Sequence, residues 1–433
     1  MMQSMKSFFA RYRESTLARN TVWMFLGQGL RIIVQAGYFI IIARSLGVQQ
    51  YGAFMAVAAT VGIIAPFIGI GSDKLIVKNV VRDRALLDVY FGNGVLMTLA
   101  SGLAGVGFAV LICNRILPSS IPVDIILMVA IADLICYRLM DLAAAAFQSV
   151  EKLGITALIT VLVSAARFLG IAVTALLLRH PTAEQWSFVY AGSTVVALVI
   201  SLLWTMFLVK SFQVAPRRIR GELVEGFYFA TGQSAQSVYN DVDKTMLASL
   251  STLGANGIYA AAYRLIDVSF TPVRSLLFAA YPGYFRHGKG EISGAFKYAK
   301  RLLPRPLAFS LLVFVGLLVG APLVPKILGS EYLRTVEALR WLAFLPFLKT
   351  LHYFMADTLT GTGFQGLRMR IQLGVAAFNV LLNLWIIPLY SWRGAAWSSL
   401  ASDGLLALLM WFAIAALKRR QPAATVDPAP IVA

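Results

Sequence analysis

The strongest constraint on this chain is a series of long apolar runs that fill it almost from end to end. Each run, at about 20 residues, is long enough to cross the hydrocarbon core of a bilayer as a helix. Of the 433 residues, 59% are apolar and 13% are charged, whereas soluble domains are about a quarter charged. The sequence therefore predicts an all-α polytopic membrane protein with twelve spans, placed at about 20–43, 52–72, 89–113, 122–147, 154–178, 186–209, 227–250, 256–284, 302–328, 336–359, 369–391 and 394–417.

The basic residues alternate between the predicted loops in a way that sets the topology. If the N-terminus is cytoplasmic, the cytoplasmic segments hold 23 Lys and Arg residues and the outer segments hold 6. Cytoplasmic loops of membrane proteins carry such an excess. We therefore expect a multi-pass protein of the bacterial cytoplasmic (inner) membrane with both termini cytoplasmic. The same rule accounts for most of the net charge of +18, so nucleic acid is not an expected partner.

The two terminal segments lie outside the predicted spans. Residues 1–19 are basic and precede an apolar run, as in a signal peptide, but the run is too long and contains Arg31. We therefore expect an uncleaved first span behind a cytoplasmic basic segment. Residues 418–433 are Pro/Ala-rich after three basic residues, which predicts a disordered cytoplasmic tail.

A weak internal repeat divides the chain. A shift of 205 residues aligns 25–54 with 230–259 and brings Gly52 onto Gly257. This shift is close to half the chain and superimposes the first span on the seventh. Two six-helix halves around a central cavity are a known transporter plan. We therefore expect two pseudo-symmetric six-helix bundles, at 20–209 and 227–417, joined by the basic cytoplasmic linker 210–226.

Three predicted spans carry a polar face, although a charge in the middle of a bilayer costs about 2.5–3.5 kcal/mol or more. Residues three, four, seven or eleven positions apart share one face of a helix. The polar faces comprise Gln28, Arg31, Gln35 and Tyr38 in the first span, Gln233, Ser237, Asn240 and Lys244 in the seventh, and Arg264, Asp267, Thr271 and Arg274 in the eighth. Asp241 and Asp243 flank the face of the seventh span.

Two interpretations account for these polar faces. One is internal salt bridges, between Asp241 and Lys244 and between Arg264 and Asp267. The other is a hydrated cavity walled by the first, seventh and eighth spans, in which basic groups receive an anion and acids balance charge or couple an ion. The matched faces at equivalent repeat positions favour the cavity. Its expected substrate-binding residues are Arg31, Lys244, Arg264, Arg274, Gln28, Gln35, Asn240 and Ser237, and its coupling or charge-balancing residues are Asp241, Asp243 and Asp267.

Other polar residues inside the predicted spans have simpler interpretations. Arg138 and Asp141 form a local pair, and Arg167 is a partner for the acids of the fourth span. Asn379 and Asn383 are four residues apart and fit hydrogen bonding between helices. Arg305, Arg340 and Lys349 are placed near enough to span ends to snorkel. His352 and Asp357 are proton-relay candidates, with a plain hydrogen bond as the alternative for the histidine.

The number and positions of the cysteine and histidine residues exclude several kinds of site. The chain has two cysteines, both in apolar runs, and three scattered histidines. This pattern supports neither a disulfide framework nor a zinc site. We expect no cofactor and no metal, with an unidentified coupling ion, H⁺ or Na⁺, as the one open question.

Four stretches resemble a known family: GSDKLIVKNVVRDRALLDVYFGN, NDVDKTMLASLSTLGANGIYAAAYRLID, LGSEYLRTVEALRWLAFLPFL and FNVLLNLWIIPLYSWRGAAWSSLAS. They are similar to Wzx-type polysaccharide biosynthesis proteins, the lipid-linked oligosaccharide flippases of the multidrug/oligosaccharidyl-lipid/polysaccharide exporter superfamily. The similarity runs from about Asn20 to Leu417. Its most specific part is Asn383 to Ala396. There the sequence YSWRGAA departs mildly from the family pattern, because the glycine that usually precedes the end of the pattern is replaced.

The resemblance implies a flippase and not an enzyme. Such a protein moves an undecaprenyl-pyrophosphate-linked oligosaccharide across the inner membrane by alternating access, for O-antigen or exopolysaccharide assembly. The basic residues of the polar faces then meet the pyrophosphate, and the amide and hydroxyl groups meet sugar hydroxyls. The implied partners are the lipid-linked anionic glycan, membrane lipids, and a polysaccharide polymerase with its export machinery.

Two other functions remain open from the sequence. A drug/cation antiporter of the same superfamily predicts an acidic cavity, which the basic excess in the first, seventh and eighth spans opposes. A membrane polysaccharide polymerase or ligase predicts a large catalytic outer loop. The predicted loops are all shorter than about 20 residues and show no nucleophile–base pair.

Overall fold

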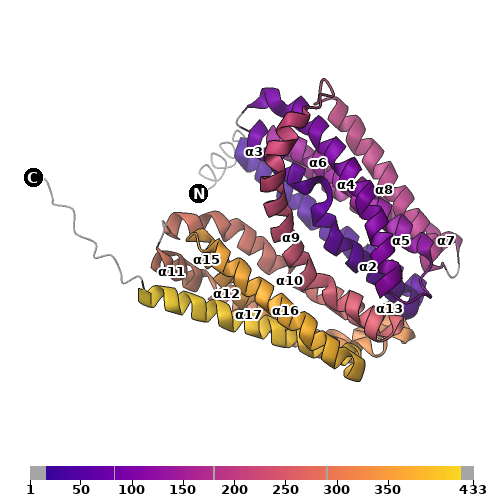
Figure 1. Ribbon diagram of the computed structural model, residues 1–433. Helices are drawn as coiled ribbons and strands as arrows, with labels where there is room; N and C mark the ends of the chain where they lie inside the picture. Colours follow the sequence, from indigo (N-terminus) through magenta and orange to yellow (C-terminus); the bar gives the residue numbers. More distant parts are fainter. Residues whose placement is uncertain (1–15, 82, 179–180, 289–290, 421–433) are drawn as a thin grey trace, which may run out of the picture. The chain divides into compact units, whose positions relative to one another are not determined.

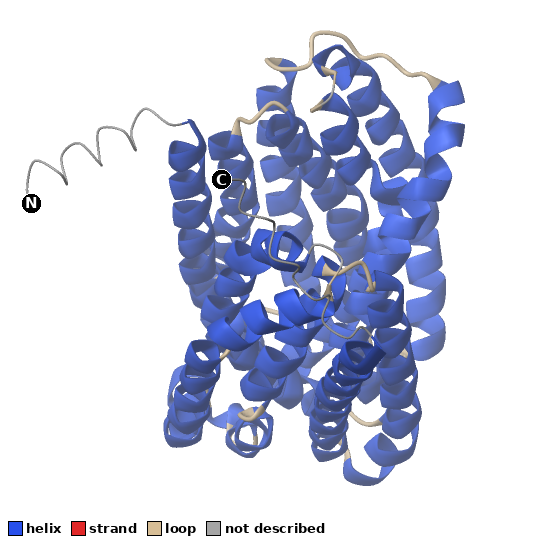
Figure 2. Cartoon of the chain, turned by 90° about the vertical axis from the view of Figure 1, so that its left-hand side faces the viewer, coloured by secondary structure: helices blue, strands red, loops and turns tan. Residues whose placement is uncertain are grey.

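The computed structural model describes residues 16–81, 83–178, 181–288 and 291–420, and every regular element in this part of the chain is a helix (Figure 2). The expected all-α class with twelve spans is confirmed, because each predicted span lies in a helix or in consecutive helical segments. The first two predicted spans share the helix Thr16–Ile64, which is kinked at Gly47 in the predicted loop between them. The predictions for residues 1–15 and 421–433 lie outside the described residues. The last helix continues to Arg420 and so includes the first three residues of the predicted tail.

The chain divides into two compact units (Figure 1). The first runs up to Ala260 and includes Lys326–Tyr332, and the second holds Ala261–Pro325 and the residues from Leu333 onward. The elements up to the boundary are α2 (Thr16–Ile64), η1 (Ala65–Gly71), α3 (Ser72–Val80), η2 (Arg84–Leu86), α4 (Leu87–Ile116), α5 (Val123–Ala130), η3 (Ile131–Cys136), α6 (Tyr137–Ser149), α7 (Leu153–Leu177), α8 (Ala183–Met206), α9 (Pro216–Leu250) and α10 (Leu253–Gly288). They are followed by α11 (Ile292–Leu302), α12 (Pro304–Gly320), η4 (Ala321–Leu323), α13 (Val324–Leu328), η5 (Ser330–Tyr332), α14 (Thr335–Leu342), α15 (Leu345–Gly361), α16 (Gln365–Tyr390) and α17 (Trp392–Arg420).

The boundary between the units lies within α10, whereas the sequence places the junction of the two halves in the linker 210–226. The cause is α9, the predicted seventh span, which packs along α2 and η1 in the first unit. The Ser234 hydroxyl donates to the Ile63 carbonyl at 3.2 Å, and the hydroxyls of Thr60 and Thr245 lie 3.1 Å apart. The halves 20–209 and 227–417 stay a prediction about the repeat, while the contacts assign α9 to the first unit.

Seven segments of the described chain are long and apolar enough to cross a membrane on length and composition alone. The first, Gly29–Val80, contains most of the first predicted span and all of the second. Helices α9 and α10 are long enough but are not in this set, since they carry the charged faces noted above. Large apolar side chains such as Leu176 of α7 and Met206 of α8 are largely exposed on the helices, as expected for surfaces that face lipid.

The second predicted span is not one continuous helix. The helix ends at Ile64, and residues Ala65–Gly71 follow an irregular path before α3 begins at Ser72. Gly69 has φ 73° and Gly71 has φ 70°, a region that favours glycine. Pro66 lies at the start of this break, where its missing N–H costs no helical hydrogen bond.

Small residues hold the core of the first unit together. Helix α6 contains four consecutive alanines, at 143–146, all of them buried. The last two pack with α3 and α4 in a cluster that includes Ile76, and the first two pack with α7 in a cluster that includes Ile159. Small side chains let membrane helices approach closely, so α6 is the central packing element that positions the charged residues at its N-terminal end.

Candidate functional site

The charged face of α9 is organised around an ion pair. Lys244 donates to the Asp241 carboxylate three residues earlier and to the Asn240 carbonyl oxygen at 3.4 Å. The Lys244 side chain is 7% exposed and that of Asp241 is 33% exposed. The predicted internal pair is therefore present, and the acid is its more accessible member. A ligand that approaches this face meets Asp241 before it meets Lys244.

Asp243 has a different environment from Asp241. Its side chain is buried and accepts a hydrogen bond from the Tyr259 hydroxyl of α10 at 2.9 Å. This bond joins α9 to the beginning of α10 within the first unit. The two aspartates that the sequence treats together thus differ in burial and in partner.

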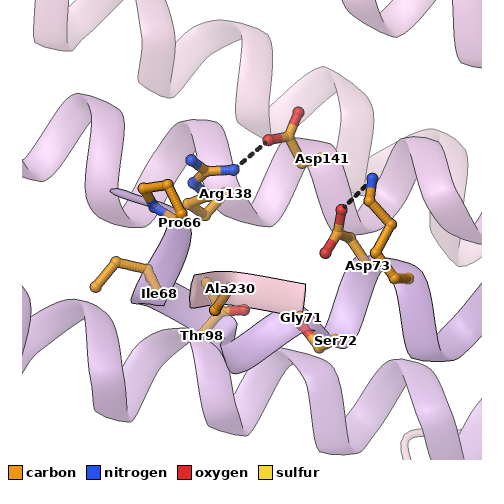
Figure 3. A pocket seen from close by; sticks show the side chains of 10 residues that line it. Pro66, Ile68, Gly71, Ser72, Asp73, Thr98, Arg138, Asp141 and Ala230 are labelled. Carbon is orange, nitrogen blue, oxygen red and sulfur yellow. Dashed lines mark hydrogen bonds and ion pairs between the residues drawn. The ribbon is translucent and has the colours of Figure 1, made fainter. Parts of the chain in front are cut away.

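A narrow crevice opens beside the break in the second span (Figure 3). Its charged lining is two ion pairs, Arg138 with Asp141 at 3.1 Å and Lys74 with Asp73 at 2.8 Å. The space between the lining groups, counted out to solvent, is about 360 Å³. Arg31 of α2 is half-buried and acts electrostatically on Asp141. Arg138 is therefore the direct partner of Asp141 in the crevice, and Arg31 is a more distant positive charge.

The remaining predicted polar residues of the first unit lie along α2 and α9. The Gln35 amide donates to the Ser164 hydroxyl of α7 at 3.5 Å. Ser237 and Asn240 of α9 are half-buried. The side chain of Gln28 lies outside the described residues. The structure therefore places Gln35 against another helix of its own unit and leaves Ser237 and Asn240 partly accessible.

The second unit contains a cluster around one carboxylate. Asp267 of α10 lies 3.7 Å from the Arg274 guanidinium and 3.8 Å from the Lys349 ammonium of α15. Lys349 is 3% exposed and also donates to the Tyr263 hydroxyl at 2.8 Å. Arg274 is 59% exposed. Asp267 is half-buried, and so is Arg264 one helical turn before it. Two cations thus share one acid.

Lys349 corrects an expectation from the sequence. The sequence predicts that it snorkels toward a membrane interface, whereas it is buried in the second unit between Tyr263 and Asp267. The sequence position of Lys349 could have indicated its burial. It lies thirteen residues into the predicted span 336–359, which is too far from either end for the ammonium group to reach water. Asp267 pairs with Arg274 and Lys349, and its predicted pair with Arg264 stays a prediction.

Several other intramembrane groups are satisfied inside their own unit. Arg167 binds Asp133 at 2.8 Å, as expected for a partner of the fourth-span acids, and the Tyr190 hydroxyl donates to the same carboxylate. Asn379 donates to Ser398 and Ser402 of α17, which confirms the helix-to-helix interpretation. The local pair of Arg138 with Asp141 is likewise confirmed. Such contacts lower the cost of placing polar groups among apolar helices.

The two proton-relay candidates are in separate contacts. His352 lies 2.8 Å from Asp403 of α17. Asp357 pairs with Arg368 of α16 at 3.3 Å. Among the described residues, no group of three or more His, Cys, Asp or Glu side chains is arranged to hold a metal ion.

One protein family matches the chain over much of its length. Residues 17–285, more than half of the chain, match the family described as polysaccharide biosynthesis protein. No curated protein sequence matches the chain.

Similar solved structures share the fold. An inward-facing multidrug resistance MATE family transporter of the MOP superfamily has a TM-score of 0.71 at 13% identity, covering 90% of this chain and 96% of that one. An outward-facing conformation of such a transporter has a TM-score of 0.63 at 14% identity, covering 95% and 98%. A MOP superfamily transporter from Pyrococcus furiosus, described as having a binding pocket of reversed polarity, has a TM-score of 0.62 at 13% identity, covering 93% and 96%. The chain thus shares the helical fold of these structures, and its match over more than half of its length shows that it belongs to the family of polysaccharide biosynthesis proteins.

Proposed function

We propose that this transporter is a flippase for a lipid-linked oligosaccharide whose lipid carrier bears an anionic pyrophosphate. In this proposal it carries undecaprenyl-pyrophosphate-linked repeat units from the cytoplasmic to the outer leaflet of the inner membrane by alternating access. The family match supports a role in polysaccharide assembly. The product then serves a polysaccharide polymerase and its export machinery, which places transport before polymerisation and assigns no catalytic step to this chain.

The observation that carries the proposal is the ratio of cations to acids. Asp267 has Arg274 and Lys349 within 4 Å, and Asp141 is acted on by Arg31 and Arg138. Each of these clusters therefore keeps about one positive charge after its acid is neutralised. A pyrophosphate needs such charges to replace its water and counter-ions, and arginine offers a fork that fits two phosphate oxygens.

The proposed role of each polar side chain follows from its exposure to solvent. Arg274 and Arg31 are partly open to solvent and make the first contact with the phosphates. Lys244 is held by Asp241 and contributes only when the phosphate displaces that carboxylate. Ser237 and Asn240 are half-buried on the same helix and meet sugar hydroxyls. Asp241, Asp243 and Asp267 remain the candidates for coupling an ion, H⁺ or Na⁺.

A drug/cation antiporter is the second candidate function, because multidrug transporters share the fold. It requires acids that lack cationic partners, so that an organic cation can take the place of the partner. In the described chain, Asp133, Asp141, Asp241, Asp267 and Asp357 are each within 4 Å of an Arg or Lys group. The pocket of reversed polarity described for the Pyrococcus furiosus relative is consistent with one fold serving ligands of either charge.

The test uses a strain that lacks the protein and measures which leaflet holds the lipid-linked repeat unit. We expect the repeat unit to face the cytoplasm in the null strain and to be exported when the wild type is restored. Arg31→Ala and Arg274→Ala should each reduce export at least tenfold at normal protein levels. Arg393→Ala is the matched control, since Arg393 pairs with Glu337 at an exposed site. Repeat units that face outward in the null strain would show a polymerase instead, and organic-cation efflux with normal export would show an antiporter.

A further inference from the structure

Two glycines that correspond in the internal repeat touch each other in the structure. Gly52 of α2 and Gly257 of α10 are 205 residues apart, the same shift that relates the two halves of the sequence. Both lie in the first unit and both are buried. Contact between equivalent positions of two repeats is the arrangement that a two-fold axis produces when it passes between them.

The two helices contact each other through equivalent atoms. A Cβ on Gly52 would overlap the carbonyl oxygen of Leu253, and a Cβ on Gly257 would overlap the carbonyl oxygen of Val48. Val48 and Leu253 are also 205 residues apart. Each helix therefore presses its glycine against the backbone of the other at the same relative position. This geometry supports the weak repeat seen in the sequence, because a chance alignment would not pair four positions in this way.

Hydrogen bonds reinforce the contact at the same end of α2. Asn256 is fully buried and its amide donates to the Gly52 carbonyl at 2.8 Å. The Val48 N–H donates to the Glu331 carboxylate at 2.9 Å, and the Tyr332 hydroxyl donates to the Ala43 carbonyl at 2.9 Å. Burial raises the pKa of Tyr332, so its hydroxyl keeps the proton that it donates. We call Gly52, Gly257, Asn256, Glu331 and Tyr332 the glycine clasp.

All parts of the glycine clasp lie at one side of the proposed membrane topology. Residues 44–51, 251–255 and 329–335 are outer loops or their edges when the N-terminus is cytoplasmic. Helix backbones that touch through glycine leave no space for a passing molecule. The contact is made by backbone atoms and by the hydrogen bonds named above, which suits an interface that opens and closes.

We propose that Gly52 and Gly257 close the transport pathway at its outer end, and that the two helices must separate there for the outward-open state. This inference rests on the proposed function, since it uses the direction of transport assigned above. The two glycines are positioning residues: they set how closely the helices meet and contact no substrate. Equivalent positions should have equivalent effects, so Gly52→Ala and Gly257→Ala are expected to give the same phenotype.

The experiment measures opening without using the substrate. Thr271 of α10 is half-buried on the polar face of the eighth span, and Thr271→Cys provides a thiol on a background in which Cys113 and Cys136 are replaced by serine. A membrane-impermeant thiol reagent is added from the periplasmic side. Gly52→Ala and Gly257→Ala should each raise the labelling rate at least five-fold and reduce export, because the added Cβ holds the helices apart.

The matched control is Gly254→Ala, one turn from Gly257 on the same helix. A Cβ there would meet only the Gln49 side chain at 3.7 Å, so labelling and export should stay at the wild-type level. Asn256→Ala removes the bond to Gly52 without adding atoms and should raise labelling in the same direction. This variant keeps the test informative if an added Cβ prevents folding.

The outcomes separate the two proposals. Unchanged labelling in Gly52→Ala, Gly257→Ala and Asn256→Ala, at normal protein levels, would overturn the role of the glycine clasp. A rise that also occurs in Gly254→Ala would overturn it as well, because the effect would then not depend on the contact. Raised labelling in a protein whose loss leaves lipid-linked repeat units correctly exported would retain the glycine clasp and refute the proposed substrate.

Discussion

The ammonium group of Lys349 donates a hydrogen bond to the hydroxyl of Tyr263 at 2.8 Å, deep inside the second unit. The same ammonium lies over the Tyr263 ring, 4.5 Å from its centroid, and 3.8 Å from Asp267. A buried lysine keeps its charge only where such partners replace water. Lys349 is therefore the fixed cation of a cluster whose other cation, Arg274, is exposed.

Replacing Lys349 by methionine tests this cluster. Lys349→Met keeps the length of the side chain but removes the charge and the donor to Tyr263. We expect export to fall at least tenfold, since Asp267 would then neutralise Arg274 and the cluster would lose its positive charge. Export of the repeat unit is measured at matched protein levels. Lys326→Met, which replaces an exposed lysine of α13, is the control, and equal export in both variants would contradict the prediction.

Arg167 is expected to act on stability and not on transport specificity. Arg167→Gln leaves Asp133 without its cation inside the bundle, and among the described residues the Tyr190 hydroxyl stays as its donor. Breaking a fully buried pair costs about 3–5 kcal/mol. Both side chains of this pair are half-buried, so the free energy of unfolding should fall by about 3 kcal/mol, the lower end of that range. Denaturant unfolding in detergent measures this change. Arg393→Gln is the control, because it breaks an exposed pair that solvent screens. It should leave the free energy of unfolding close to that of the wild type. Similar losses in the two variants would contradict the prediction that the Arg167 pair contributes more to stability.

Asp241 is expected to compete with the substrate for Lys244. Asp241→Asn removes the carboxylate that holds the ammonium, so an anionic ligand no longer has to displace it. The association constant for undecaprenyl pyrophosphate should rise about five-fold, which is equivalent to about 1 kcal/mol of binding free energy. Titration of the purified protein with this lipid measures the change. Asp243→Asn should leave binding within two-fold, because Asp243 faces Tyr259; weaker binding by Asp241→Asn would assign the carboxylate to the ligand site.

Asn379 provides a structural test in the second unit. Its amide joins α16 to α17 through Ser398 and Ser402. Interhelical hydrogen bonds of this kind in membranes are worth about 0.6 kcal/mol on average and up to about 1.7. Asn379→Ala should lower the free energy of unfolding by about 1 kcal/mol and leave export unchanged. The double variant with Ser402→Ala should lose less than the two single variants together, because they share one bond; full additivity would argue against that bond.

The polar groups differ in how far the sequence could assign them. The pairs Asp241–Lys244 and Arg138–Asp141 were predictable, because residues three apart on a helix are neighbours whatever surrounds it. The partner Tyr263 of Lys349 was not, because it lies 86 residues away in the chain. Arg167 was predicted to pair with the acids of the fourth span, but the sequence did not single out Asp133, which lies 34 residues away. The break at Ala65–Gly71 left signals in its proline and glycines, yet in an apolar run these residues are equally compatible with a continuous span.

What the sequence by itself determined is the number of spans, their all-α character and the faces on which charges lie. Those properties follow from the bilayer, which requires each apolar run to satisfy its own backbone as a helix and makes an unpaired charge in lipid costly. Tertiary structure alone decided which charges pair, which stay accessible and that Gly52 meets Gly257. The helical period determines on which face of its own helix a residue lies. Ion pairs and backbone contacts depend on which faces of distant helices are packed together.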